Sequence, residues 1–255
     1  MKIEAALKSR SFFRILSVLL ALILWQILAT RINMDMMLAS PIQVLERLFT
    51  IWREPDFFST LFFSWSRIMS GFLLAFLGGF LMGTLAGALR PVELLLWPYV
   101  TVAKTVPIAS FIILCLLWLN YSQMTVFIAF LIAFPVIYAN VLQGIRSTDP
   151  KLNEVASFYR IPWYRKYLFI TLPSVKPYLI SACGVAIGMA WKAGVAAEVI
   201  GIIDGSIGEK LYEGKIYFLN ADLLSWTLIL ILLSVLNERL FSLFLKGVFR
   251  GVQKL

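Results

Sequence analysis

The 255-residue chain is 60% hydrophobic and only 15% charged, with a mean hydropathy of +0.86. Soluble domains are about 45–50% apolar and about 25% charged, so this composition excludes a soluble protein and indicates one that crosses a membrane. The net charge of +9 does not indicate a nucleic-acid-binding protein, because the basic residues lie between apolar blocks rather than in one stripe. Both cysteines lie inside apolar blocks and histidine is absent, so neither a disulfide framework nor a metal site is expected.

Six apolar segments are long enough to cross a bilayer, which takes about twenty residues of α-helix. In chain order they cover residues 12–29, 66–89, 94–119, 124–142, 175–199 and 223–245. The first segment follows a short basic N-terminus and has no small-residue cleavage site after it at Ala29-Thr30-Arg31, so we expect a retained helix. The third contains Pro98 and Pro107, which fits either a kinked helix or a short helix followed by a span.

The predicted fold is therefore all-α. We expect a polytopic transmembrane helical bundle of about six membrane-spanning helices, with an outer amphipathic helix and two short cytoplasmic helices. A single transmembrane domain over residues 1–255 is expected, with its core at 60–246 and the first span plus the outer amphipathic helix at 11–58.

The orientation follows from the lysines and arginines of the connecting segments, which are enriched on the cytoplasmic side of membrane proteins. With the N-terminus in the cytoplasm, thirteen Lys and Arg of the connections fall inside and five fall outside. The acidic residues, among them Asp35 and Asp222, lean toward the outside. Both termini are then expected in the cytoplasm, together with a polar segment at 153–173.

An amphipathic helix is predicted between the first two spans. Ser40 is a candidate N-cap and Pro41 stands at the first helical position. The apolar residues that follow share one helical face: Ile42, Leu45, Leu48, Phe49 and Trp52. We interpret the helix as lying on the outer membrane surface, either as a plain connector or as an element for substrate entry or docking.

The second and fifth spans are rich in small residues at a spacing of four. Gly79, Gly83 and Gly87 mark the second span, and Gly184 and Gly188 mark the fifth. Such spacing lets helix backbones approach closely, so we interpret both stripes as packing interfaces inside the bundle.

Motifs for most membrane enzymes and channels are absent from the sequence. The chain has no GxxxxGK[ST] loop, so any ATP hydrolysis would come from another chain. It also has no HExxH or GxSxG motif, no TVGYG-like filter and no arginine-rich span. An intramembrane enzyme and a voltage sensor are therefore not supported.

Lys104 is the first of a few residues within the spans that are candidates for a solute path. It lies between the two prolines of the third span, about 16 Å along a helix that starts near Glu93. It would either contact solute near mid-bilayer, together with Pro107 and Ser110, or lie at a helix break and extend its ammonium group to cytoplasmic water.

Lys192 and Glu198 lie toward the outer end of the fifth span. Lys192 falls about 28 Å along the helix, and Glu198 lies at or beyond the membrane edge. Their separation of six residues puts them on different helix faces. Lys192 would extend to the interface, while Glu198 would close an outer gate or cap the helix end. With Trp191, they complete the possible substrate path.

The polar segment before the fifth span predicts two short helices. Asp149 is a candidate N-cap and Pro150 a first helical residue, so the first helix would cover 150–158. The second would cover 162–170, and Leu172-Pro173 is expected to break the chain before the span. By itself, this pattern also fits interfacial helices that rest on anionic lipid through Arg165, Lys166 and Lys176.

The same segment resembles the permeases of binding-protein-dependent ABC importers. These carry E-A-A-x-x-x-G, nine further residues and I-x-L-P before their penultimate helix. This chain keeps every spacing, with Glu154-Val155-Ala156, then Arg160, then Ile170-Thr171-Leu172-Pro173. Val155 replaces the middle alanine, and Arg160 replaces the glycine at a turn where a positive φ would be uncommon for another residue.

Similarity to the nitrate, sulfonate and taurine branch of that family extends over about 40–245. It is carried by residues 40–45, 67–75, 105–107, 190–191, 197–198 and 205–208. The resemblance implies a multi-pass protein of the bacterial cytoplasmic (inner) membrane, paired with a second permease copy as a homodimer. Two separate ATP-binding ABC subunits would bind its cytoplasmic face and carry ATP and Mg²⁺.

On this resemblance the chain itself would bind no cofactor or metal and would hold no catalytic residue. An extracytoplasmic substrate-binding protein would deliver solute to a bundle surrounded by membrane lipid, and no nucleic acid is expected. The coupling helix that docks on the ATPase would comprise Leu152, Glu154, Val155, Ala156, Tyr159, Arg160, Leu172 and Pro173.

The solute of this branch would be a small anion, a sulfonate or a heterocyclic precursor. Two other function classes remain open from the residues. One is a self-contained channel or secondary transporter, which would need intramembrane ion ligands. The other is a membrane scaffold that recruits a soluble enzyme through the polar segment without transport.

Overall fold

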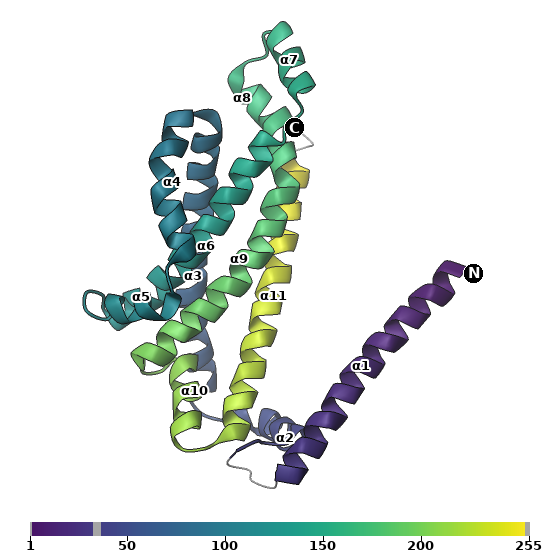
Figure 1. Cartoon of the computed structure of the whole chain (residues 1–255), viewed down its shortest axis with the longest axis vertical. Coiled ribbons are helices and arrows are strands. Elements are labelled where there is room, and N and C mark those ends of the chain that lie inside the picture. The colour runs from purple at the N-terminus through teal and green to yellow at the C-terminus, as the bar shows by residue number, and fades with distance from the viewer. Residues whose placement is uncertain (1, 33–36, 253–255) are drawn as a thin grey trace. The chain divides into compact units, whose positions relative to one another are not determined.

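The computed structural model describes residues 2–32 and 37–252, and the regular elements within these ranges are helices (Figure 1). The expected all-α class is confirmed. Asp35 and the chain ends, at residue 1 and at residues 253–255, lie outside the described residues, so the cytoplasmic position of both termini stays a prediction.

Long helices and short ones are both present along the chain. In order they are α1 (Lys2–Ile32), α2 (Pro41–Ile51), α3 (Phe57–Ala88), α4 (Arg90–Thr105), α5 (Ile108–Cys115), α6 (Tyr121–Arg146), α7 (Pro150–Phe158), α8 (Trp163–Lys166), the π-helix η1 (Tyr167–Thr171), α9 (Leu172–Gly201), α10 (Ile207–Ile216) and α11 (Asn220–Val252).

Five helical stretches in the described part of the chain are long and apolar enough to cross a membrane, and the number rises to six if a bent pair of helices counts as one span. The five are Ile15–Ile32, Phe57–Ala88, Tyr121–Arg146, Trp163–Gly201 and Asn220–Gly251. They coincide with the first, second, fourth, fifth and sixth predicted spans, which agrees with the expected bundle of about six.

The third predicted span is a broken helix. α4 and α5 meet at 102° around Val106 and Pro107. Val106 is extended, with φ −61° and ψ 128°, because the ring of a following proline disfavours the helical conformation. Pro98 lies inside α4 without ending it. A short helix followed by a span is wrong, because the 16-residue α4 comes first and α5 has only 8 residues.

Backbone contacts divide the chain into two compact units. The first comprises Met1–Phe58 and Glu209–Ile229, and the second comprises Ser59–Gly208 and Leu230–Leu255. The expectation of one domain over 1–255 stays a prediction.

In the first unit, α2 begins as predicted. The Ser40 hydroxyl accepts a hydrogen bond from the amide of Gln43, and the Gln43 side chain accepts one of 2.7 Å from the amide of Ser40, with Pro41 next in the chain. Buried Val44 and Ile51 anchor the helix. The opposite face is exposed and apolar, through Ile42, Leu45, Phe49 and Trp52, as expected of a helix on a membrane surface.

An ion-pair cluster in the same unit fastens α2 to the start of α11. The Arg47 guanidinium contacts both Asp222 and Glu54, and the Ser225 hydroxyl donates to the carbonyl of Val44 at 3.2 Å. Partial burial lowers the pKa of Arg47, but the hydrogen bonds to Asp222 and Glu54 outweigh it, so the pKa is raised above the ordinary arginine value.

In the second unit, the glycines of α3 let that helix lie directly on α6. A Cβ on Gly71 would come within 2.3 Å of the Val126 carbonyl oxygen, and a Cβ on Gly83 within 2.8 Å of the Val141 Cβ. The predicted packing role of the small-residue stripe in the second span is therefore confirmed.

The fifth-span stripe packs only in part. A Cβ on Gly184 would lie 3.0 Å from Glu238 Oε1 of α11, but Gly188 has no neighbour within 4 Å. α9 also crosses α6 closely, because a Cβ on Gly144 would lie 2.9 Å from the Cα of Val175.

The expected break at Leu172-Pro173 is wrong. α8, η1 and α9 form one helical stretch over Trp163–Gly201 (Figure 1). Pro173 has no amide hydrogen and cannot complete the ordinary helical ladder. The chain widens into a π-turn just before it, where the Leu172 amide donates to the Tyr167 carbonyl, and this turn absorbs the proline without ending the helix.

Candidate functional site

The segment between α6 and α9 holds the first group of candidate residues. α7 starts as predicted, because the Asp149 carboxylate accepts a hydrogen bond of 2.9 Å from the Lys151 amide and Pro150 takes the first helical position. Its observed bounds, Pro150–Phe158, agree with the predicted 150–158. Figure 1 shows α7 beyond the ends of α3 and α4 of the same unit.

α7 packs inward through a small residue and presents larger ones outward. Ala156 is only 2% exposed, whereas Leu152 and Val155 are 47% and 50% exposed. Glu154 is exposed as well and makes no ion pair within residues 2–32 and 37–252. Since none of the residues that the structure describes covers these outer side chains, the helix is anchored on one side and open to a partner on the other.

Arg160 adopts the conformation that glycine would take at this turn. Its φ is 50°, in the left-handed region, and the turn closes in the Schellman pattern. The Ile161 amide donates to the Ala156 carbonyl at 2.9 Å, and the Arg160 amide donates to the Ser157 carbonyl at 3.1 Å. The departure from the family glycine therefore keeps the turn geometry, at a steric cost of about 1–2 kcal/mol.

Large aromatic side chains surround this turn without being covered. Phe158 is 81% exposed, Tyr159 71% and Trp163 82%. Exposed aromatic groups that flank a capped, anchored helix are typical of a protein–protein contact. Leu172 and Pro173, which the sequence groups with α7, instead lie half-buried at the start of α9, beyond η1.

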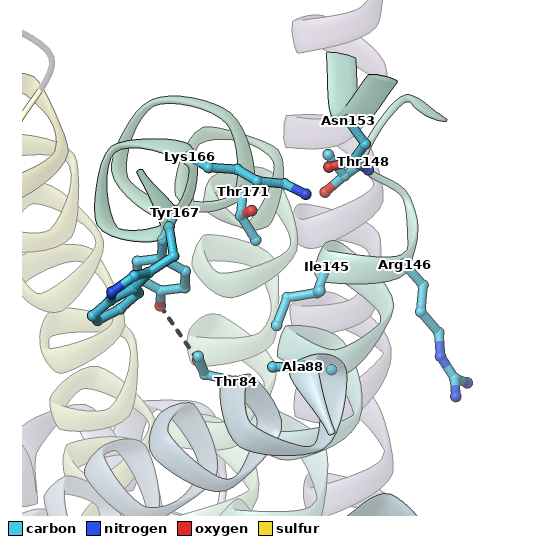
Figure 2. A pocket seen from close by; sticks show the side chains of 11 residues that line it. Thr84, Ala88, Ile145, Arg146, Thr148, Asn153, Lys166, Tyr167 and Thr171 are labelled. Atoms are coloured by element: carbon cyan, nitrogen blue, oxygen red, sulfur yellow. Dashed lines mark hydrogen bonds between the residues drawn. The ribbon is translucent and has the colours of Figure 1, made fainter. Parts of the chain in front are cut away.

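A cavity of about 430 Å³ lies beneath the same segment. Figure 2 shows Lys166 pointing toward Thr148 and Asn153, and Tyr167 facing Thr84 of α3, with 3.4 Å between their hydroxyl oxygens. Arg146 points away from this cavity and pairs with Glu93. The sequence did not indicate the contact between Tyr167 and Thr84.

Lys104 lines a different cavity, of about 250 Å³, between α4 and α6. Glu93, Tyr138 and Arg146 share its wall, so the lysine faces a polar space rather than an apolar one. Pro107 and Ser110 are exposed near the bend and do not line this cavity. The structure therefore does not bring the three predicted path residues of this region together.

Lys192 lines a third cavity, of about 280 Å³, whose other walls are apolar. Ile112 of α5, Ile132 of α6 and Met189 of α9 contribute to it. The neighbouring Trp191 points elsewhere: it is fully buried, and its indole nitrogen has no hydrogen-bond partner in the described part of the chain.

Glu198 is buried and holds the C-terminal end of α9 to its surroundings. Its Oε2 accepts a hydrogen bond of 2.8 Å from the Ser64 hydroxyl of α3 and one of 3.3 Å from the Gly208 amide. The Ser64 oxygen also accepts from the Ile207 amide at 2.9 Å. Gly208 fits only because it lacks a side chain, since a Cβ there would lie 2.3 Å from the Glu198 Cβ.

Sequence reasoning missed Ser64 and Gly208 as partners of Glu198. Serine is common in membrane helices, and the glycine lies in a short polar loop, so neither had a distinctive pattern. The residues Gly205 to Gly208 did appear as a point of family similarity, and that was the one indication that this loop is constrained.

These features define a class of protein. A polytopic helical bundle with cavities between its helices, no nucleotide-binding loop and one anchored, outward-facing helix pair is a membrane transport component. More particularly, residues 75–250 match the family of binding-protein-dependent transport system inner membrane components, and the chain belongs to that family.

Individual relatives agree with this assignment. The chain is 29% identical over 179 residues to the "Putative aliphatic sulfonates transport permease protein SsuC" of Bacillus subtilis (strain 168), which covers 70% of this chain and 64% of that protein. It is 29% identical over 203 residues to the nitrate import permease protein NrtB of Synechococcus elongatus (strain ATCC 33912 / PCC 7942 / FACHB-805), covering 75% and 72%.

A solved structure shares the fold. It is titled "Crystal structure of an amino acid ABC transporter with histidines", and it aligns with a TM-score of 0.62 and 16% sequence identity, over 78% of this chain and 97% of that chain. At this identity the likeness establishes the helical arrangement alone.

Proposed function

We propose that this chain is the permease subunit of an ABC importer. It would form the translocation path for a small solute, and separate ATPase subunits would drive the transport. The observation that carries the proposal is α7, which is fixed to the bundle through buried Ala156 and leaves Leu152, Val155 and Glu154 uncovered. The family assignment supports the same role.

Coupling requires a short helix that a partner protein can bind. The helix must also be fixed to the bundle, so that the two move together. The Asp149 cap and the Schellman turn at Arg160 fix both ends of α7. α8 then continues through η1 into α9 without a break. Movement of a docked ATPase would therefore reach the fifth span through a continuous backbone.

The partners follow from the same proposal. Two ATP-binding subunits would carry ATP and Mg²⁺, and a second copy of this permease would complete the path as a homodimer. An extracytoplasmic binding protein would deliver the solute, and both termini would lie in the cytoplasm of a bacterial inner-membrane system.

For the solute we propose a small anion or a sulfonate. A heterocyclic precursor is the third class of solute that the family branch implies. The names of two relatives refer to aliphatic sulfonates and to nitrate. Lys192, in the wall of a cavity between α5 and α9, would supply a positive charge along the path. Lys104 would do the same between α4 and α6.

The test reconstitutes the permease in proteoliposomes with its ATPase subunit and its substrate-binding protein. ATP-dependent uptake of nitrate or an alkanesulfonate is expected, and the permease alone should hydrolyse no ATP. Ala156→Leu, which adds volume at a buried position, and Glu154→Ala should both lower coupled uptake. Lys151→Gln changes an exposed residue of the same helix and serves as the matched control.

Three outcomes would contradict the proposal. Uptake that persists without the ATPase would indicate a self-contained channel or secondary transporter. ATPase binding without uptake of any offered solute would indicate a scaffold. Full coupled transport in both the Glu154 and Ala156 variants would show that α7 is not the coupling helix.

A further inference from the structure

Two arginines line one hollow at the turn between α7 and α8. Arg160 comes from the turn itself and Arg165 from α8. The hollow has a volume of about 580 Å³, and its remaining wall is formed by Tyr159, Ile161, Pro162, Phe169 and Ile170. It lies on a different part of the segment from the cavity beneath Lys166.

Within residues 2–32 and 37–252, neither arginine has an anionic partner. Both side chains are exposed, and no ion pair or hydrogen bond of either guanidinium occurs in the region that the structure describes. Two like charges on one hollow repel each other, and an anion between them removes that repulsion. The arrangement thus has the charge and the donors for a carboxylate, which arginine binds through parallel hydrogen bonds.

The backbone of Arg160 adds a second, independent observation. Its φ of 50° is a conformation that glycine adopts freely and that a residue with a side chain adopts at a cost. Residues in such strained conformations cluster at functional sites. Arginine at this position adds a guanidinium group to the hollow, which glycine would not supply.

We propose that this hollow binds an acidic side chain, Asp or Glu, on the docking surface of the ATPase subunit. The proposal rests on the proposed function and names a contact within that interface. The exposed Phe158 and Trp163 border the same turn and suit a protein partner. Figure 1 shows α7 beyond the ends of α3 and α4 of the same unit.

The experiment measures binding of the co-encoded P-loop ATPase to the full permease in nanodiscs. Arg160→Gly and Arg165→Gln are each expected to weaken binding about five- to tenfold, and to reduce its dependence on salt. Arg90→Gln removes an exposed arginine of α4, outside the segment between α6 and α9, and should leave the affinity unchanged within about twofold.

Two further measurements make the result specific. The Arg160→Gly variant should melt at the same temperature as the natural chain or higher, because glycine suits the turn, so weaker binding would not reflect misfolding. In the Arg160→Lys variant, a carbodiimide should link the amine at position 160 to an Asp or Glu of the ATPase, identified by mass spectrometry.

Unchanged ATPase affinity in both arginine variants would overturn the inference while leaving the proposed function in place. Fewer phosphatidylglycerol molecules bound to the purified arginine variants than to the natural chain, with ATPase affinity intact, would overturn it as well and assign the hollow to the membrane. Failure of the natural chain to bind any ATPase would overturn the proposed function together with the inference.

Discussion

The Ser64 hydroxyl donates a hydrogen bond of 2.8 Å to Glu198, although the two residues are 134 positions apart. The same oxygen accepts the amide of Ile207 at 2.9 Å, so one serine of α3 joins the end of α9 to the start of α10. Both side chains are fully buried, which excludes water as a substitute for either partner.

Ser64→Ala is expected to lower the unfolding free energy by about 1–3 kcal/mol, because it leaves a buried carboxylate oxygen and a buried amide with fewer partners. The measurement is thermal unfolding in detergent. Ser70→Ala is the matched control, since the exposed Ser70 bonds only to the carbonyl of Ser66, one turn earlier in its own helix. Equal melting temperatures for the two variants would contradict the importance of the Ser64 contacts.

Gly71→Ala should destabilise the bundle by about 1–3 kcal/mol, because the new Cβ would meet the Val126 carbonyl oxygen at 2.3 Å and backbone cannot move aside cheaply. Gly188→Ala provides the comparison. It also lies in a membrane helix, but nothing surrounds it within 4 Å. It should therefore be neutral or raise stability slightly. Melting curves of the two variants measure the contrast, and similar losses in both would argue against the close approach of α3 and α6.

The ion pair between Arg47 and Asp222 should give a measurable coupling energy in the free energy of unfolding. A double-mutant cycle of Arg47→Gln and Asp222→Asn should give about 0.2–1 kcal/mol, because both side chains are partly exposed and the pair is screened by salt. Additive effects of the two substitutions would contradict the pairing.

The pH dependence of this cluster follows from the raised pKa of Arg47. A base whose pKa is raised on folding contributes stability that is fully present below its unfolded pKa and is lost only above it. The titration of Arg47 should therefore cause no loss of stability between about pH 6 and pH 9. A difference between the natural chain and Arg47→Gln that disappeared on going from pH 6 to pH 9 would contradict this sign.

Phe158→Ala and Trp163→Ala should separate binding from folding. Both side chains are more than four-fifths exposed, so each substitution should change the unfolding free energy by less than about 0.5 kcal/mol. Each should nevertheless reduce the amount of ATPase that co-purifies with the permease, because aromatic anchors carry much of the energy of an interface. A variant that melts early, or one that retains all its ATPase, would go against this expectation.

The local features of the fold were largely predictable, because each depends on a few adjacent residues. The helix caps at Ser40 and Asp149 could be predicted from the capping side chain and the proline that follows it. The glycine stripe of α3 indicated close packing through its spacing alone. The Asp149-Pro150 pair and the helical spacing after it predicted the bounds of α7.

Contacts between distant segments were not predictable in the same way. Nothing near Glu198 in the sequence indicates that Ser64 lies beside it. The π-turn before Pro173 was missed because proline ordinarily ends or kinks a helix, and whether the ladder widens instead depends on tertiary packing. At Arg160 the sequence raised the right question, but only the backbone angle shows that arginine keeps the glycine conformation.

The unbroken stretch from Trp163 to Gly201 has a mechanical consequence. Its 39 helical residues extend about 58 Å at 1.5 Å per residue, from the docking turn at one end to the Ser64–Glu198 contact at the other. A flexible linker would absorb a displacement of α8. A continuous helix transmits that displacement to its far end. If α7 docks on an ATPase as proposed, the fifth span would thus act as a lever arm, with the wide turn at Tyr167–Thr171 near its docked end.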